Sequence, residues 1–556
     1  MKTVIIGGVA GGASAAARLR RLDEAAEIII LERGGYVSFA NCGLPYYVGG
    51  VIANQSQLTL QTPESFRARF RIDVRVRHEA VSLNPEAQTV TVRNLDTGET
   101  YTESYDSLIL SPGAEPIRPE MEGAGSPQVF TLRNIPDTLK IKEYIDQAKP
   151  RTTVVVGGGY IGVEMAENLR QAGLQVAVVE RASHLIAPLD PDMAADVHRY
   201  IQSQGIQLYL NNGVKAIGSR DVVLQTGSIP ADMVILSVGV RPETGLAQAC
   251  GIPTNQRGSI VVDSRMRTGV PNIYAVGDAV EAENFITGAP AFLPLAGPAN
   301  KQGRVAADQI AGVDSVYTGT QGSAVLKLFD MTIAATGLNE AAAAAAGLSY
   351  DKTYLYAGSH AGYYPGASNM SIKALWDKET LKILGAQIVG FEGVDKRMDV
   401  LATAIRLGAK ITDLAQLELC YAPPFGSAKD PVNMLGFVAE NIVTGKVKQF
   451  FWHDVDRLPR DGSVSLLDVR TPAEVSQGRI EGFASIPLDS LRDRLGELPP
   501  GKPVYVHCHS GLRSYIACRI LTGRGYDCYN LAGGWRLYQS ATHQQTVSEY
   551  SCTDCK

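Results

Sequence analysis

The chain of 556 residues lacks several features that would assign it to a class at once. It has no apolar run approaching the ~18 residues that a membrane-spanning helix needs. It has no long run of lysine and arginine, and its formal net charge of −5 gives no electrostatic case for nucleic acid. We therefore expect a protein that binds neither membranes nor nucleic acid.

Cysteine is scarce as well. The eight cysteines are too few and too scattered for a disulfide scaffold in a chain this long. The N-terminus superficially resembles a signal peptide, but its glycines follow a nucleotide-loop spacing and a charged segment, 18–27, comes next. We therefore expect a cytoplasmic protein, in which any reactive thiol is catalytic or redox-active. Four cysteines are predicted to be small buried side chains: Cys250, Cys420, Cys518 and Cys528.

A glycine-rich turn follows the first predicted strand, residues 2–6. The turn is Gly7-Gly8-Val9-Ala10-Gly11-Gly12, an alanine-rich helix follows, and a second strand, 27–31, ends on Glu32. In such a βαβ unit the glycines let the backbone approach a pyrophosphate, and the acid holds ribose hydroxyls. Because Val9 replaces the middle glycine of the usual pattern, this unit alone would also fit an ordinary tight turn.

The same pattern occurs again from residue 152. A strand, 152–156, leads into Gly157-Gly158-Gly159-Tyr160-Ile161-Gly162, and a second strand, 175–179, ends on Glu180. Two such units in one chain predict two dinucleotide sites. Glu180 favours the 2′-hydroxyl of NADH, whereas Arg181 keeps NADPH as an alternative. Further on, Asp278 follows a predicted strand, where an acid suits a flavin ribityl hydroxyl or caps a helix.

Two cysteines lie in distinct reactive settings. Cys42 lies in Ser38-Phe39-Ala40-Asn41-Cys42-Gly43, just after the first glycine-rich unit. Cys508 opens the loop Cys508-His509-Ser510-Gly511-Leu512-Arg513, between a strand-like and a helix-like run. The four residues between Cys508 and Arg513 predict a small nest of backbone N–H groups, which suits a persulfide. Cysteine-dependent phosphatases have five intervening residues there, which leaves room for a phosphate.

Residues 1 to about 445 resemble the pyridine nucleotide–disulfide oxidoreductases, in particular the single-cysteine branch with coenzyme A-disulfide reductase, NADH oxidase and NADH peroxidase. Residues from about 453 to 545 resemble a rhodanese domain. The whole is similar to the coenzyme A-disulfide reductase–rhodanese fusions, also called NAD(P)H-dependent persulfide reductases. The motifs that carry these resemblances are the two glycine-rich turns, the Cys42 segment, 274–279, 421–425, Asp468-Val469-Arg470 with Glu474, 478–482, the Cys508 loop and 530–535.

The resemblance implies an α/β fold with two Rossmann-like nucleotide-binding domains, an α/β dimerisation domain and a C-terminal rhodanese domain. The expected boundaries are 1–115 and 266–325 for the FAD-binding domain, 116–265 for the NAD(P)H-binding domain, 326–446 for the dimerisation domain, 447–462 for a linker, 463–545 for the rhodanese domain and 546–556 for a flexible tail with Cys552 and Cys555.

Departures from the family pattern narrow the function. Tyr47 stands where glutathione-reductase-like enzymes have a second cysteine, and the C-terminal His-x4-Glu pair of those enzymes is missing. Ala10 replaces the histidine of NADH peroxidases, so a peroxide-cleaving role lacks its proton donor. Phe70 occupies the position of a family lysine, with Arg69 and Arg71 beside it, which puts phosphate anchoring there in doubt.

The resemblance also implies the site residues. The catalytic residues are Cys42, Cys508, Arg513 and, from a second subunit, Tyr421. FAD-binding residues are Gly7, Gly11, Gly12, Glu32, Arg33, Asn41, Cys42, Gly113, Gly277, Asp278 and Ala296. Those for NADH are Gly157, Gly159, Tyr160, Ile161, Gly162, Glu164 and Glu180. Those for coenzyme A are Ser14, Arg18, Arg21, Ser38, Asn41, Asn300 and Lys429, with Tyr363 or Tyr364 from the second subunit. No metal site is expected.

We therefore expect a homodimeric FAD- and NADH-dependent reductase of coenzyme A persulfide, related persulfides or polysulfide, which releases sulfide. The Cys42 thiolate attacks the sulfur–sulfur bond, and the position of Cys42 near a helix start and a flavin is expected to favour the thiolate. One alternative is a coenzyme A-disulfide reductase whose rhodanese domain handles a separate sulfur. Another is a sulfur-binding redox sensor. Cys552 and Cys555 fit either a resolving pair or a passive tail.

Overall fold

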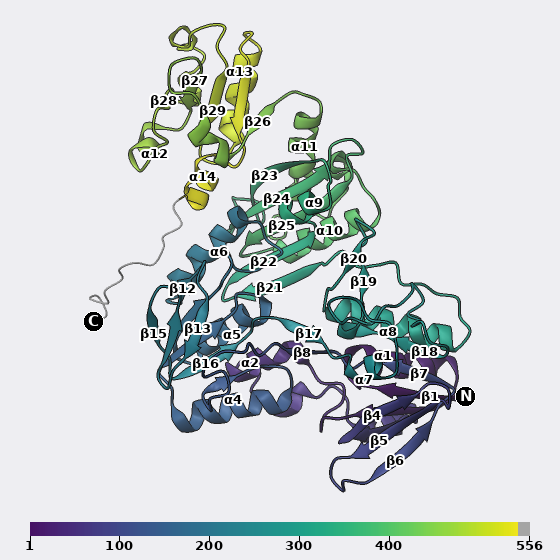
Figure 1. Ribbon diagram of the computed structural model, residues 1–556. Coiled ribbons are helices and arrows are strands. Elements are labelled where there is room, and N and C mark those ends of the chain that lie inside the picture. Colours follow the sequence, from purple (N-terminus) through teal and green to yellow (C-terminus); the bar gives the residue numbers. More distant parts are fainter. Residues whose placement is uncertain (543–556) are drawn as a thin grey trace. The chain divides into compact units, whose positions relative to one another are not determined.

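The structure, a computed structural model, describes residues 1–542 (Figure 1). The chain divides into two compact units. The first comprises Met1–Arg181 and Asn211–Gly322, and the second comprises Ala182–Leu210 and the residues from Ser323 onward. Among the described helices, none combines the length and the apolar character needed to cross a membrane.

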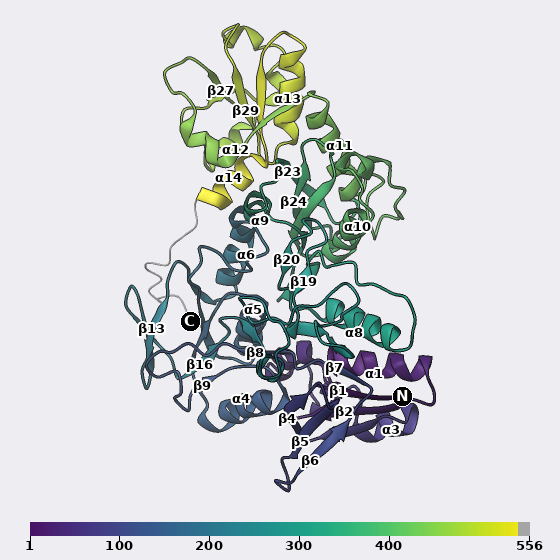
Figure 2. The same cartoon turned by 45° about the vertical axis from the view of Figure 1, so that its right-hand side comes forward.

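A five-stranded parallel sheet in the first unit has the order β18-β7-β1-β2-β3. Val4, Ile5 and Ile6 of its central strand β1 are buried, as expected for a parallel sheet covered by helices. Helices α1 and α8 pack side by side (Figure 2). Ile5 of β1 and Leu19 of α1 belong to one buried apolar cluster. Strand β18 comes from far along the chain, as predicted for a nucleotide-binding domain built from two segments.

The second parallel sheet of this unit contains the order β11-β10-β16-β9. Its strands β10 and β11 have the predicted bounds, and helix α5 begins within the glycine-rich turn. Two three-stranded antiparallel sheets, β4-β5-β6 and β13-β14-β15, complete the unit together with the strand pairs β8–β17 and β19–β20. Both predicted dinucleotide units therefore form.

The elements of the first unit have the following bounds. The strands are β1 Lys2–Ile6, β2 Glu27–Glu32, β3 Asp73–Val76, β4 His78–Asn84, β5 Thr89–Asn94, β6 Thr100–Ser104, β7 Ser107–Leu110, β8 Ala114–Pro116, β9 Val129–Phe130, β10 Thr152–Val156, β11 Gln175–Val179, β13 Val214–Ile217, β14 Asp221–Leu224, β15 Ser228–Pro230, β16 Met233–Leu236, β17 Val240–Pro242, β18 Ile273–Ala275, β19 Ala282–Glu283 and β20 Pro290–Ala291. The helices are α1 Ala10–Leu22, α2 Leu44–Val48, α3 Pro63–Phe70, α4 Ile135–Ala148, α5 Tyr160–Gln171, α7 Gly245–Ala249 and α8 Ala296–Ile310, with the 3₁₀ helices η1 Asn41–Gly43, η2 Gln55–Leu58 and η3 Gly277–Ala279.

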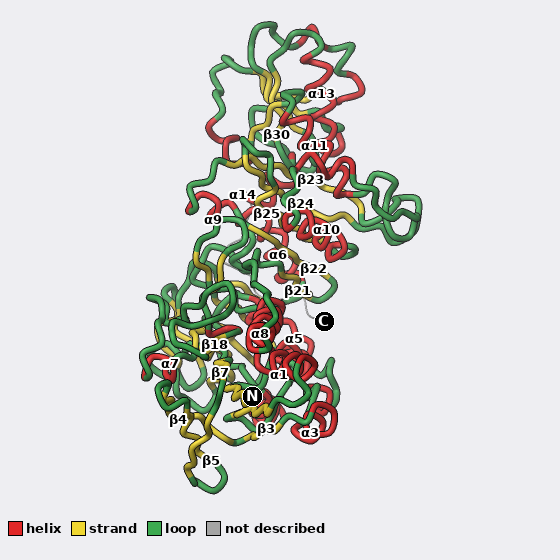
Figure 3. The backbone as a smooth tube through the Cα atoms, turned by 90° about the vertical axis from the view of Figure 1, so that its right-hand side faces the viewer, coloured by secondary structure: helices red, strands yellow, loops and turns green. Residues whose placement is uncertain are grey.

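The second unit contains an antiparallel sheet, β21-β22-β25-β24-β23, and a parallel sheet, β26-β30-β29-β27-β28. Helix α13 packs against β29 and β30 of the parallel sheet (Figure 3). The strands are β12 Gln207–Tyr209, β21 Ala324–Leu328, β22 Met331–Gly337, β23 Tyr350–Gly358, β24 Asn369–Asp377, β25 Ile383–Gly390, β26 Lys448–Phe450, β27 Ser465–Asp468, β28 Ala484–Ser485, β29 Val504–His507 and β30 Cys528–Leu531. The helices are α6 Pro191–Ser203, α9 Glu340–Ala345, α10 Val394–Arg406, α11 Pro431–Val443, α12 Pro472–Ser476, α13 Leu512–Thr522 and α14 Gly534–Thr542, with the 3₁₀ helices η4 Ile411–Gln416, η5 Trp452–Arg457, η6 Leu488–Ser490 and η7 Leu495–Glu497.

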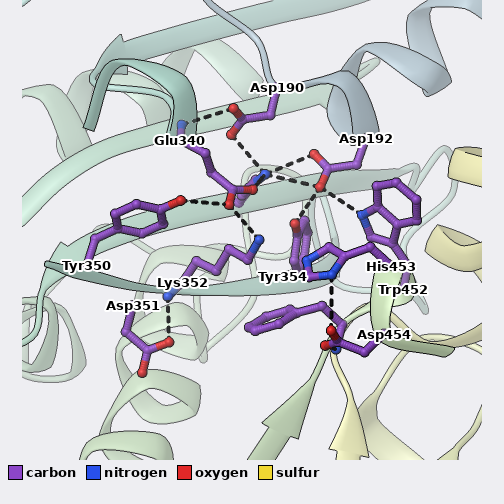
Figure 4. A network of polar contacts seen from close by, with 12 residues as sticks. Asp190, Asp192, Glu340, Tyr350, Asp351, Lys352, Tyr354, Trp452, His453 and Asp454 are labelled. Carbon is purple, nitrogen blue, oxygen red and sulfur yellow. Dashed lines mark hydrogen bonds and ion pairs between the residues drawn. The ribbon is translucent and has the colours of Figure 1, made fainter. Parts of the chain in front are cut away.

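A buried polar network joins the two sheets of this unit through the segment predicted as a linker (Figure 4). The ammonium group of Lys373, fully buried on β24, lies 2.8 Å from Asp190 Oδ2, 2.9 Å from Asp192 Oδ1 and 2.5 Å from Glu340 Oε1. Trp452 Nε1 donates to Asp192 Oδ2 at 3.2 Å. Because β26 and η5 fall within 447–462, this segment is folded onto its neighbours rather than an open tether.

Candidate active sites

Both glycine-rich turns have the geometry that a dinucleotide requires. Gly7 and Gly157 adopt φ of +94° and +108°, and a Cβ there would lie 2.1 Å from Ser111 O and 2.3 Å from Ser237 O. A Cβ at Gly12 would lie 1.9 Å from Gly7 O, and the equivalent Gly162 is as tightly packed. Only glycine fits these positions, so the backbone remains close to the helix start, where a pyrophosphate binds.

The acid that ends the second strand of each unit is fixed against its own turn. Glu32 accepts hydrogen bonds from Gly8 N at 3.0 Å and Gly34 N at 2.7 Å. Glu180 accepts one from Gly158 N at 2.6 Å. A Cβ at Gly159 would meet no atom within 4 Å, so this turn has an open side. Carboxylates at these two places fit the ribose hydroxyls of FAD and of a nicotinamide dinucleotide.

The predicted flavin acid lies beside a narrow hollow at the start of α8. Gly277 and Asp278 line this hollow, and Gly277 N donates to Gln302 Oε1 at 2.8 Å. Asp278 lies on η3, a three-residue 3₁₀ helix, where the sequence had predicted a regular helix. Burial raises the pKa of Asp278, and Arg133 opposes the rise. A desolvated carboxyl beside a hollow fits a polyol hydroxyl.

Three further residues predicted to bind FAD have different surroundings. Ala296 is the first residue of α8, directly after Leu295, which lines the hollow. Gly113 has φ of +76°, a conformation that favours glycine. The guanidinium of Arg33 lies 2.6 Å from Glu243 Oε1, so its charge is already paired.

Cys42 lies on η1 immediately before α2, so its predicted position near a helix start is confirmed. The expectation that its surroundings favour the thiolate is wrong for the described side chains. Although the residue is exposed, loss of water around the sulfur raises the pKa of the Cys42 thiol, and Glu164 and Asp278 raise it further. Desolvation, with a smaller effect of the two acids, therefore disfavours the thiolate.

Glu164 lies on α5, one turn after Tyr160, as the pattern predicts. Burial raises the pKa of Glu164 to about 7, and Glu167 adds to the rise. Tyr46 on α2 donates its hydroxyl to Glu164 Oε1 at 3.3 Å. Burial also raises the pKa of Tyr160, to about 12. The carboxyl therefore titrates near neutral pH.

A separate hollow of about 390 Å³ gathers most of the residues predicted for coenzyme A in the first unit: Ser14, Arg18, Arg21, Ser38 and Asn300. Ser14 Oγ donates to Asn300 Oδ1, and Ser38 has a left-handed φ of 46°. The charge of Arg18 is already paired, since its Nε lies 2.6 Å from the buried Asp308 Oδ1. Arg21 and Arg304 are exposed, and neither forms an ion pair among residues 1–542.

Phe70 also lines this hollow, together with Phe66, so an aromatic surface replaces the family lysine. Arg69 and Arg71 are exposed but do not line it. Arg304, which the sequence reasoning missed, is the additional cation. It lies on α8 four residues after Asn300, a spacing that places both on one helix face.

The tyrosines predicted to reach a second subunit form an exposed group in the second unit. Tyr363 and Tyr421 are 77% and 48% exposed, and their hydroxyls are 2.9 Å apart. Tyr364 and Lys429 are exposed close to them in the sequence. Phe425 in the same loop is 71% exposed. Such exposed aromatic side chains are typical of a surface that another chain covers.

The loop that starts at Cys508 is complete and closed around its sulfur. Cys508 is fully buried, and its Sγ accepts hydrogen bonds from Gly511 N at 3.1 Å and from Ser514 Oγ at 3.3 Å. The first amides of α14 hold the loop, because Trp535 N donates to Cys508 O at 2.8 Å. Two donors on one sulfur stabilise negative charge there. Ser514 was not among the predicted site residues.

Two ion pairs surround this loop. Arg513 makes two bonds to Glu474, at 2.6 and 2.7 Å, and this pairing lowers the pKa of Glu474 to about 2. Arg470, packed over the ring of Trp535, pairs with the buried Asp468 at 2.8 Å. Arg513 therefore does not point at the sulfur as a free cation; it is held beside the loop by Glu474.

The other cysteines only partly follow the prediction. Cys518 and Cys528 are buried, Cys250 is half-buried and Cys420 is exposed, so the prediction of a buried Cys420 is wrong. Cys420 directly precedes Tyr421 and shares the exposed loop. Cys552 and Cys555 lie outside the described residues.

Models of three protein families match the chain. Residues 1–303 match the pyridine nucleotide-disulphide oxidoreductases, residues 323–431 match the dimerisation domain of that family, and residues 452–541 match the rhodanese-like domain. The first model alone covers more than half of the chain.

Characterised relatives match along most of the chain. Coenzyme A disulfide reductase of Staphylococcus epidermidis is 37% identical over 443 residues, which are 79% of this chain and 100% of the relative. The crystal structure of reduced Bacillus anthracis CoADR-RHD is 50% identical with a TM-score of 0.95, covering 97% of this chain and 98% of the other. The NAD-dependent persulfide reductase from A. fulgidus is 35% identical with a TM-score of 0.90, covering 98% and 100%.

Proposed function

The chain belongs to the pyridine nucleotide-disulphide oxidoreductases, and from that premise we propose that it is a reductase of coenzyme A persulfide and related sulfane sulfur, fused to a sulfurtransferase. The observation that carries the proposal is the presence of two separate thiol sites in one polypeptide. Cys42 lies near two nucleotide turns, and Cys508 lies in a closed loop with two donors on its sulfur.

Sulfur chemistry begins at Cys42. Its thiolate attacks the sulfane sulfur of R–S–SH, a bond forms from Cys42 Sγ to that sulfur, and R–S⁻ leaves and takes up a proton. When bound, FAD would supply the two electrons, drawn from the nicotinamide cofactor, that return the Cys42 persulfide to the thiolate and hydrosulfide. Asp278 and Glu32 would hold FAD, and Glu180 would hold the nicotinamide dinucleotide and favour NADH.

Coenzyme A would bind at the hollow of about 390 Å³ beside α1 and α8. Arg21 and Arg304 would pair with its phosphates, since neither is engaged in an ion pair among residues 1–542. The rings of Phe66 and Phe70 offer an apolar face to the base. Arg18, already paired with Asp308, would support the wall rather than bind a phosphate.

The rhodanese-like loop would carry a sulfane sulfur on Cys508. The amide of Gly511 and the hydroxyl of Ser514 stabilise charge on the outgoing sulfur, and the Arg513–Glu474 pair holds the loop in shape. The enzyme would act as a homodimer, in which Tyr421 and Tyr363 of one chain approach the thiol of the other. The exposure of both rings supports this assembly.

A second candidate is a coenzyme A-disulfide reductase, which the Staphylococcus relatives favour by their activity. The Arg21 and Arg304 pair supports either substrate, because both contain coenzyme A phosphates. The rhodanese-like domain, absent from the 443-residue relatives, favours the persulfide.

One experiment tests the proposal. Purified enzyme is given NADH without oxygen and a panel of acceptors: coenzyme A persulfide, glutathione persulfide, polysulfide and coenzyme A disulfide. We expect NADH oxidation with stoichiometric sulfide from the persulfides. Fast oxidation with the disulfide and slow oxidation with persulfides would favour the second candidate. Negligible NADH consumption with every acceptor would point to a redox sensor.

A further inference from the structure

A polar contact links the helix after Cys42 to the helix that carries Glu164, and the proposed reaction does not use it. Tyr46 on α2 donates to Glu164 Oε1 on α5 at 3.3 Å. The two helices approach closely, because a Cβ at Gly49 would lie 2.4 Å from Asn168 Oδ1. The tyrosine is therefore held against the acid by the packing of α2 on α5.

The charges around this contact act on one another. The Tyr46 hydrogen bond favours the ionised carboxyl and lowers the pKa of Glu164, against the larger effect of burial and that of Glu167 on the same helix. The Glu164 carboxylate in turn raises the pKa of the Cys42 thiol, after burial and ahead of Asp278 on η3. Arg133 is a cation that acts on Asp278.

We propose that Tyr46 is a positioning residue: it holds the Glu164 carboxyl against α2, the helix that begins two residues after Cys42, and Glu164 thereby sets the reactivity of this thiol. The assignment rests on the proposed function in one respect, that Cys42 carries the reduction. Burial raises the pKa of Tyr46 itself, so its hydroxyl keeps its proton and remains a donor throughout the working pH range.

The consequence is a coupled titration of acid and thiol. Below about pH 7 the neutral Glu164 has little effect on the thiol, and above it the carboxylate disfavours the thiolate. Replacing Glu164 with Gln removes this effect at every pH. Replacing Tyr46 with Phe removes one hydrogen bond to the carboxylate. The pH at which Glu164 begins to disfavour the thiolate then rises by about 0.5–1 pH unit.

The test is the rate at which iodoacetamide alkylates Cys42, followed by mass spectrometry of its peptide in the FAD-loaded enzyme from pH 6 to about 9.5. We expect wild type and Glu164→Gln to react equally at the acidic end and to diverge above about pH 7, with Glu164→Gln about three- to tenfold faster. The alkylation rate of Tyr46→Phe should fall below that of Glu164→Gln only at a higher pH than the wild-type rate does. The double variant Tyr46→Phe, Glu164→Gln should react at the same rate as Glu164→Gln alone.

The neighbouring Tyr47→Phe is the matched control on the same helix and should match wild type. Overlapping profiles of Glu164→Gln and wild type at all pH values would overturn the coupling. A Tyr46→Phe profile that diverges at the wild-type pH would overturn the positioning role. No sulfur substrate is present, so an enzyme inactive toward persulfides would fail the proposed function and leave this test unaffected. Flavin absorbance reports that each variant is folded and loaded.

Discussion

The two reactive thiols of this chain are placed in opposite surroundings. Cys42 is exposed, follows a short loop and has two acids that disfavour its thiolate. Cys508 is fully buried, and two hydrogen-bond donors contact its sulfur. The first site depends on groups that act from other helices and on bound cofactors, whereas the second is stabilised by its own loop. In the proposed function, the same functional group would therefore serve two chemistries because of its neighbours.

The largest effect should come from replacing each of the two cysteines with serine. Cys42→Ser should lower NADH-linked sulfur reduction on the order of 10³-fold or more while sulfur transfer to cyanide continues, because the nucleophile is lost at one site only. Cys508→Ser should reverse the pattern. Parallel assays of NADH oxidation and thiocyanate formation measure both. Free small persulfides should still be reduced by Cys508→Ser, whereas donors that need sulfur relayed through Cys508 should not. If no donor depends on Cys508, the domains are merely tethered.

The next effect concerns the hollow of about 390 Å³ in the first unit, which we propose for coenzyme A. Replacing Arg21 and Arg304 together with Ala should raise KM for coenzyme A persulfide and spare small polysulfides, at a cost of about 2–4 kcal/mol. Arg69→Ala is the control, since Arg69 is exposed but does not line the hollow. Steady-state kinetics with both substrates gives the comparison. Equal losses with both substrates would mean that these arginines support the fold or bind FAD.

A smaller effect should appear at the rhodanese-like loop alone. Ser514→Ala removes one of the two donors on the Cys508 sulfur, and we expect about a tenfold loss of sulfur transfer, which corresponds to roughly 1.4 kcal/mol. Ser510→Ala in the same loop is the control. NADH oxidation with free persulfides should be unchanged in both variants. A loss there would indicate that the two sites share a step.

The smallest expected effect is a difference in pH dependence between the two carboxyls, Glu474 and Glu164. The pKa of Glu474 is about 2, so its pair with Arg513 keeps both charges well below neutrality, and the stabilisation is lost only as pH falls from about 4.5 through 2. Glu164, with a pKa of about 7, loses its charge between about pH 8 and 6. The rate ratio of wild type to Glu474→Gln in sulfur transfer should therefore stay constant over that range. A ratio that changes would mean that another group titrates at the loop.

Much of the fold could be predicted because its patterns are local. The strands Lys2–Ile6 and Thr152–Val156 have the predicted bounds, since apolar runs and glycine turns define them within a few residues. Strand Lys448–Phe450 was missed. It is short, half polar and defined only by pairing with Cys528–Leu531, far along the chain.

The residues of the candidate sites also divide into those that local motifs predict and those that only long-range contacts define. Cys42, Cys508 and Glu180 follow from motifs. Arg304 could have been suspected from its helical spacing to Asn300. No motif marks Ser514. The pairing of Arg18 with Asp308 joins residues 290 positions apart, and no local pattern contains it.

By itself the sequence determined the kinds of site in this protein, because the spacing of glycines, acids and cysteines sets what a turn can hold. Tertiary structure alone decided the charge state of each site. Ionisation depends on which acids, donors and buried surfaces surround a group, and folding brings these together from distant segments. Glu164 near Cys42 and Glu474 beside Arg513 are the two outcomes, one titrating near neutrality and the other far below it.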